Sequence, residues 1–190
     1  MRCSRSLFVP IMALVACIAA TAQGPTYQLG KTPTPAEIQA WDIAIGPEGK
    51  ELPPGRGTAT EGAKIFAQRC APCHGPTAEG GIARRLVGGV GTLNTKDPLS
   101  TVGSFWPYAT TVWDYINRAM PPPPMQPGML SADEVYAVTA YLLYRNGIIK
   151  ENDVLDAQSL PKVQMPNRNG FVPPRPEWTP GMKRPFGYYP

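Results

Sequence analysis

Histidine is almost absent from this sequence, and cysteine and charged residues are scarce. The 190 residues include one histidine and four cysteines, and 17% of them are charged. With one histidine, the chain cannot supply two imidazole ligands to the same metal ion. Removing residues 1–22 leaves 16 basic and 14 acidic side chains, so the formal net charge falls from +4 to +2. A bias this small does not indicate nucleic-acid binding.

Long apolar runs are missing as well. Hydrophobic residues make up 43% of the chain, which is enough for a core. The apolar stretch at residues 7–20 is shorter than the ~20 residues that a transmembrane helix needs, and Pro10 interrupts it. The length excludes a large multidomain enzyme. Proline and glycine are abundant, with 24 and 19 residues, and they predict long irregular arms around a modest folded centre.

Residues 1–22 have the pattern of a signal peptide. Arg2 and Arg5 precede the apolar stretch, and residues 20–22 (Ala-Thr-Ala) form an A-x-A cleavage site before Gln23. We therefore expect export to the periplasm. A second route stays open, because residues 14–17 (Leu-Val-Ala-Cys) resemble the lipobox at which a bacterial lipoprotein is lipidated on its cysteine.

Two cysteines lie in the signal peptide, so the mature chain keeps only Cys70 and Cys73, in the run Cys-Ala-Pro-Cys-His that ends at His74. C-x-x-C-H is the attachment sequence for c-type haem: two thioethers hold the porphyrin, and the histidine binds the iron. The alternatives are a redox disulfide and half of a zinc site. A zinc site lacks ligands, and a thioredoxin-like motif needs a βαβ pattern that is not found here. One motif predicts one covalent haem c.

A sixth ligand for the iron must come from elsewhere. Because His74 is the single histidine, a methionine thioether is the usual remaining choice, and Met/His ligation raises the reduction potential. We favour Met120, at the end of a predicted helix, with Met165 as its rival. A methionine is also a common packing residue. The mature candidates are Met120, Met125, Met129, Met165 and Met182.

Helical periodicity dominates residues 58–150. A capping box at residues 58–61 opens a helix that runs into the haem motif. A second helix is predicted over residues 110–119, stopped by the prolines at 121–124. A third begins at the capping box of residues 131–134 and ends at Asn146-Gly147. We predict an all-α domain at 58–150, with an irregular N-terminal arm at 23–57 and a proline-rich C-terminal arm at 151–190.

These features resemble class I cytochromes c. The resemblance implies that the helix carrying Gly62 and Phe66 crosses the helix carrying Tyr141, and that Met120 binds the iron from the loop before the last helix. The prolines at 121–124, followed by Met125 and Met129, depart from the family pattern. The matching positions are Gly62, Phe66, Cys70, Cys73, His74, Met120-Pro121, residues 130–134 and Tyr141.

A closer resemblance spans roughly residues 58–172. Residues 101–116, 133–141 and 160–168 resemble the cytochrome subunit that pairs with molybdenum sulfite or sulfane dehydrogenases in bacterial sulfur oxidation. It implies an electron-transfer subunit that is not itself the enzyme: a partner chain oxidises the sulfur compound, this chain takes the electrons, and a downstream acceptor receives them. Two other functions stay open. They are a free diffusible carrier, and a haem enzyme or gas sensor with a vacant sixth position.

Several side chains near the motif have two readings. Trp106, Tyr108 and Trp113 either line the haem, one donating to a propionate, or pack in the core. Arg84 and Arg85 pair with propionates, face an acidic partner, or are solvated. The proline-rich arms with spaced aromatic residues either wrap a neighbouring protein, fold back, or stay disordered.

Overall fold

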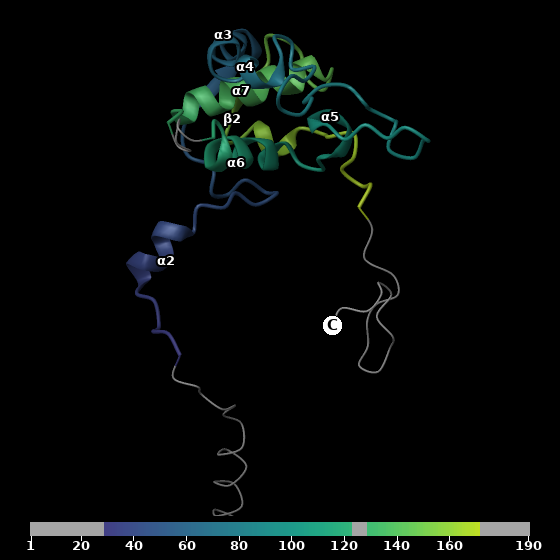
Figure 1. Ribbon diagram of the computed structural model, residues 1–190. Helices are drawn as coiled ribbons and strands as arrows, with labels where there is room; N and C mark the ends of the chain where they lie inside the picture. Colours follow the sequence, from purple (N-terminus) through teal and green to yellow (C-terminus); the bar gives the residue numbers. More distant parts are fainter. Residues whose placement is uncertain (1–28, 123–128, 172–190) are drawn as a thin grey trace, which may run out of the picture. The chain divides into compact units, whose positions relative to one another are not determined.

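A computed structural model describes residues 29–122 and 129–171 (Figure 1). The chain divides into two compact units, residues 1–42 and 43–190. No helix in the described ranges is long and apolar enough to cross a membrane. The elements, in chain order, are α2 (Pro35–Trp41), β1 (Arg56–Thr58), α3 (Ala59–Arg69), α4 (Ala71–His74), α5 (Val102–Phe105), α6 (Ala109–Ala119), α7 (Ala132–Arg145), β2 (Val154–Asp156) and the 3-10 helix η1 (Leu160–Lys162).

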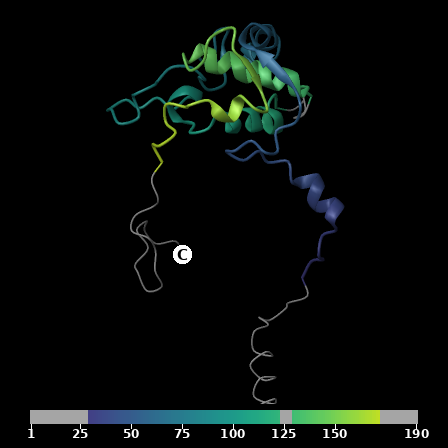
Figure 2. The ribbon, with the colours of Figure 1, turned by 180° about the vertical axis from the view of Figure 1, so that it is seen from behind.

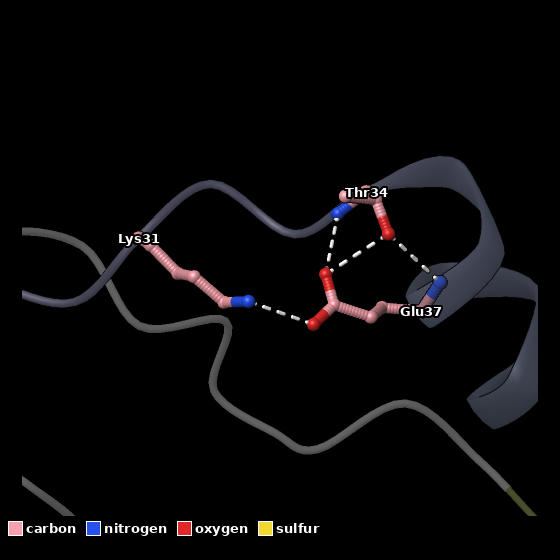
Figure 3. A network of polar contacts seen from close by, with 3 residues as sticks. All are labelled: Lys31, Thr34 and Glu37. Carbon is pink, nitrogen blue, oxygen red and sulfur yellow. Dashed lines mark hydrogen bonds and ion pairs between the residues drawn. The ribbon is translucent and has the colours of Figure 1, made fainter.

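Within residues 29–42, the first unit contains one short helix, α2, which polar contacts hold in place. Thr34 and Glu37 form a capping box, in which the Glu37 backbone N–H donates to the Thr34 hydroxyl over 3.2 Å and the Thr34 backbone N–H donates to the Glu37 carboxylate over 2.8 Å. Lys31 pairs with the same carboxylate at 2.9 Å (Figure 3). None of its residues is buried. The N-terminal arm is therefore not irregular throughout, because a local cap starts a helix without a core.

In the second unit, α3, α4 and α7 form an upper layer, with α5 and α6 beneath it (Figure 1). Its tightest contact is the crossing of α3 and α7. A Cβ atom on Gly62 would lie 1.9 Å from the backbone oxygen of Ala137, so only glycine allows the two helices to come this close. One turn further on, the rings of Phe66 and Tyr141 pack with their centroids 5.0 Å apart. This confirms the helix crossing that the resemblance implied.

The three predicted helices are all present. Thr58 and Ser131 cap α3 and α7 through the predicted capping boxes, with Glu61 and Glu134 as their partners. The α6 helix ends at Ala119, just before the proline run. It buries one face against α7, formed by Val112, Trp113 and Ile116. The unit is mostly helical, as expected, because each helix combines a start or stop signal with one apolar face.

The packed unit includes residues on both sides of the predicted 58–150 range. Strand β1 comes just before α3 in the sequence, and β2 follows α7. The two strands pair antiparallel, with Gly57 opposite Leu155. In Figure 2, seen from behind, β1 lies beside α7. Leu155, Leu160 and Met165 are 2%, 0% and 3% exposed, so the start of the C-terminal arm belongs to the core. Strands of three residues are too short to show alternation in a sequence, which is why they were not predicted.

Candidate functional site

The haem motif lies on one tight helical turn directly after α3. The backbone N–H of Cys70 still donates to the Phe66 carbonyl, over 2.9 Å, and the N–H groups of Cys73 and His74 both donate back to the Cys70 carbonyl, over 3.1 and 2.9 Å. Both cysteines are free thiols and are partly buried. The turn thus brings two thiols and an imidazole together within five residues, which is the arrangement that covalent attachment of one porphyrin requires.

The orientation of His74 is fixed by a backbone carbonyl. Its Nδ1 atom lies 2.7 Å from the carbonyl oxygen of Arg84. A carbonyl oxygen only accepts hydrogen bonds, so Nδ1 carries the proton and donates. The lone pair of a neutral imidazole is then on Nε2, which is the atom free to bind a metal ion. The sequence does not reveal the Arg84 carbonyl as the partner of His74, because every residue has a backbone carbonyl.

The loop after the motif is tied to it by further backbone hydrogen bonds. The Gly80 N–H donates to the His74 carbonyl over 2.8 Å, and the Ala83 N–H donates to the Cys73 carbonyl over 2.9 Å. Gly81 lies close to the same carbonyl, where a Cβ atom would come within 2.7 Å of the Cys73 oxygen. Glycines in this loop therefore allow close backbone packing behind the motif.

The pKa of the Cys70 thiol is shifted in the direction opposite to that of a catalytic redox thiol. Burial, with a smaller contribution from Cys73, raises its pKa to about 11. Redox-active C-x-x-C thiols have lowered pKa values, because the thiolate is the attacking species. A thiol that stays protonated at neutral pH does not favour the redox-disulfide alternative. It is compatible with a structural thioether.

The methionine candidates differ in how far protein atoms cover them. Met120 is the C-cap of α6, where its N–H donates to the Ile116 carbonyl over 3.1 Å, and its side chain is partly buried at the edge of the core. Met165 is 3% exposed and belongs to the core cluster. Met129 is 53% exposed. Met125 and Met182 lie outside the described residues. Protein atoms thus cover Met120 only in part, whereas Met165 is packed in the core.

The three aromatic candidates separate into two groups. Trp113 is 2% exposed, and its indole N–H has no hydrogen-bond partner within the described part of the chain. A buried indole N–H normally has an acceptor, and a haem propionate would supply one. Trp106 instead packs edge-on against Tyr115, with ring centroids 5.4 Å apart, and Arg168 stacks over Tyr108 at 5.2 Å. Trp113 packs in the core, with its ring centroid 5.5 Å from that of Tyr136, and its unpartnered N–H is the one feature that would suit a propionate.

The donor set therefore fits a covalent haem c. Two thiols lie on one turn, a histidine presents Nε2, a thioether lies at the edge of the core, and a buried N–H lacks an acceptor. The sequence alone did not predict that the Arg84 carbonyl accepts a hydrogen bond from His74. Nor did it find the clamp of the C-terminal arm on α5, where the Asn167 side chain donates to the Phe105 carbonyl over 2.7 Å.

Comparison with known proteins identifies the family of this chain. The Cytochrome c family pattern matches residues 59–146. A chain in the crystal structure of the sulfane dehydrogenase SoxCD from Paracoccus pantotrophus is 43% identical, with a TM-score of 0.69, and the match covers 79% of this chain and 73% of that one. The curated proteins contain no match. The chain belongs to the cytochrome c family, whose members bind haem c and transfer electrons.

Proposed function

We propose that this protein is a periplasmic cytochrome c with one haem, acting as the subunit that takes electrons from a molybdenum sulfite or sulfane dehydrogenase. The observation that carries the proposal is the His74 geometry, in which Nδ1 donates to the Arg84 carbonyl and Nε2 is left to bind iron. The 43% identity to a chain of a sulfane dehydrogenase supports the choice of partner.

Each residue of the site has a distinct role in this function. Cys70 and Cys73 would hold the porphyrin through thioethers, and His74 and Met120 would supply the two protein ligands of the iron. A haem c with both axial positions filled exchanges single electrons and does no bond chemistry. The Arg84 carbonyl keeps the proton on Nδ1 of His74 and makes Nε2 a better donor. The buried indole N–H of Trp113, which has no partner among the described residues, would be available to donate to a propionate.

The surface over α5 and α6 supports a lasting association with a partner chain. Phe105 and Phe171 pack edge to face with ring centroids 5.2 Å apart, yet they are 41% and 55% exposed. Tyr115, on α6, is 46% exposed. Large aromatic side chains are enriched in protein interfaces. We name Phe105, Phe171 and Tyr115 the aromatic face, and assign it to the dehydrogenase subunit. No motif in the sequence offers a molybdenum site, so we assign oxidation of the sulfur compound to that partner.

The proposed location and haem count rest on the sequence. Residues 1–22 have the pattern of a signal peptide, and a single C-x-x-C-H motif is present. Intact-mass measurement of the purified protein tests both: the expected mass is the chain from Gln23 plus one haem. A mass with residues 1–22 retained, or with two haems, would contradict them.

The partner is tested by isolating the native protein from the periplasmic fraction, following its haem stain, and measuring molybdenum in the purified material. We expect a second chain and molybdenum to co-purify in fixed proportion with the haem. A matched preparation carrying Tyr115→Ser and Phe171→Ser should lose both without losing haem. Isolation of the unaltered cytochrome alone, free of molybdenum, would instead favour the free carrier.

A further inference from the structure

The first unit exposes its large apolar side chains. Residues 29–42 contain three of them, Leu29, Ile38 and Trp41, and these are 88%, 53% and 87% exposed. In the second unit, by contrast, Trp113 is 2% exposed. Ile38 and Trp41 are three residues apart on α2, so they are neighbours on the surface of one helix. We name this pair the α2 face.

The helix that carries this face is ordered by its own cap. The Glu37 N–H donates to the Thr34 hydroxyl over 3.2 Å, the Thr34 N–H donates to the Glu37 carboxylate over 2.8 Å, and Lys31 pairs with that carboxylate (Figure 3). Helices shorter than about 12 residues are marginal in water, so the seven residues of α2 depend on such a cap. A partner that binds the α2 face meets a helix that is already formed, which lowers the entropy cost of binding.

The charges of the first unit favour a protein partner over a lipid surface. Residues 29–42 contain Lys31, Glu37 and Asp42, a formal net charge of −1, and Lys31 is paired with Glu37. Helices that lie on membranes carry lysine and arginine on their polar face, because lipid surfaces are anionic. The sequence of α2 contains neither residue. An uncharged face with a tryptophan is instead typical of a helix that binds in an apolar groove of another protein.

The match to a chain of the sulfane dehydrogenase SoxCD extends into the first unit. Residues 43–190 are 148 of the 190 residues, or 78% of the chain. The match covers 79%, so it includes part of the first unit even if every residue of the second unit is matched. Part of the N-terminal arm thus has a counterpart in a chain of a sulfane dehydrogenase, which supports the dehydrogenase subunit as the partner that covers α2.

We infer that the α2 face binds in an apolar groove of the dehydrogenase subunit, as a second contact besides the aromatic face. This inference rests on the proposed function, because it names the partner of that function as the occupant. Two contacts with one partner hold more tightly than either contact alone, since the second forms within the complex. The α2 contact therefore lengthens the lifetime of the complex and leaves the reduction of the haem within it unchanged.

Paired substitutions on α2 test the contact. A cytochrome with Ile38→Ser and Trp41→Ser is produced together with the dehydrogenase subunit, and the dissociation constant is measured from the haem absorbance in sedimentation velocity. We expect binding to weaken about tenfold. The haem content, and the rate of haem reduction in the saturated complex, should stay the same, because none of the residues of α2 is buried.

The matched control is Ala36→Ser with Gln39→Ser. These two residues are exposed on the same helix and are also three positions apart, but neither is a large apolar side chain. The control should change the dissociation constant less than about twofold. Thr34→Ala, which removes the cap and keeps the α2 face, should have an effect between those of the two double variants.

Hydroxyl-radical footprinting detects the contact without a substitution. Trp41 is 87% exposed in the isolated chain, so radicals should oxidise it rapidly. In the native complex we expect its oxidation to slow about fivefold or more, because a side chain in the core of an interface is screened from water. The oxidation rate of Trp41 in each sample is measured by mass spectrometry of the peptide that contains it.

The outcomes separate this inference from the proposed function. If the two double variants bind equally well, or if Trp41 oxidises at the same rate with and without the dehydrogenase subunit, the inference about α2 is overturned while the aromatic face still holds the partner. A cytochrome dimer that Ile38→Ser with Trp41→Ser dissociates would assign the α2 face to a second copy, and binding to phosphatidylglycerol vesicles would assign it to lipid. Either would overturn the inference. Isolation of the unaltered cytochrome free of molybdenum would contradict the proposed function, and with it this inference.

Discussion

Nδ1 of His74 lies 2.7 Å from the carbonyl oxygen of Arg84, ten residues further along the chain. This contact makes the haem motif more than a local sequence pattern. The motif supplies the thiols and the imidazole, and the loop that follows decides which nitrogen of the imidazole is free. The Ala83 N–H of the same loop donates to the Cys73 carbonyl over 2.9 Å, so one short segment contacts both Cys73 and His74.

Removing both thiols should release the haem from covalent attachment. In the Cys70→Ala, Cys73→Ala double variant, no thioether can form, so acid and organic solvent should extract all of the haem. The unaltered protein should keep its haem through the same extraction and stain for haem on a denaturing gel. A haem that resists extraction from the double variant would contradict the assignment of these two residues.

Met120 and Met165 should respond to substitution in opposite ways. Met120→Ala should abolish the Met-to-iron absorption band and let the reduced protein bind carbon monoxide, because the sixth position is then open. Met165→Ala should keep the band and lose about 2–5 kcal/mol of stability, because this side chain is buried in the core. Spectra and denaturant unfolding of the two variants measure these effects. Loss of the band in Met165→Ala alone would reverse the assignment.

Gly62→Ala should destabilise the protein strongly. The new Cβ atom would lie 1.9 Å from the Ala137 oxygen, so α3 and α7 would have to move apart and separate the Phe66 and Tyr141 rings. We expect a loss of about 3 kcal/mol or more in guanidinium unfolding of the holoprotein. Gly46→Ala is the control, since its nearest neighbours would be carboxylate oxygens at 3.5 and 3.7 Å. Equal unfolding midpoints for the two variants would argue against the close crossing.

The capping box of α3 should make stability depend on pH in the acid range. Hydrogen bonds from the Thr58 hydroxyl and backbone lower the pKa of Glu61 below its usual 4.5. The carboxylate therefore contributes stability above the unfolded-state pKa, and this contribution is lost as the pH falls through the lower folded-state value. NMR titration should show that Thr58→Ala raises the pKa of Glu61 toward 4.5. An unchanged pKa would show that the hydroxyl is not responsible.

The helices could be predicted because their signals are local. Thr58 and Ser131 begin α3 and α7 with capping boxes, and the prolines after Met120 end α6. The strands β1 and β2 could not, because they are short and each pairs with a segment distant in the sequence. The α5 helix was missed because four residues are too few to show periodicity, although Thr101 and Ser104 cap it locally. The α2 helix was missed although its Thr34–Glu37 box is equally local, since no apolar periodicity follows it.

The site was predictable only in part, for a similar reason. The C-x-x-C-H spacing predicts Cys70, Cys73 and His74 as the residues that hold the haem. Their roles stay predictions. The Arg84 carbonyl belongs to the backbone and leaves no trace in the sequence. The difference between Met120 and Met165 is one of burial, which depends on the return of residues 154–171 across the helices. Burial of this kind is a tertiary property and follows from packing alone.

The central claim is that this cytochrome receives electrons from a sulfur-oxidising partner. The most direct test adds sulfite, and separately a sulfane sulfur compound, to the anaerobic native complex and follows haem reduction by absorbance. We predict stoichiometric reduction within one turnover by at least one of the two, and none in a sample carrying the cytochrome alone. A haem that stays oxidised with both compounds, while dithionite reduces it fully, would contradict the claim.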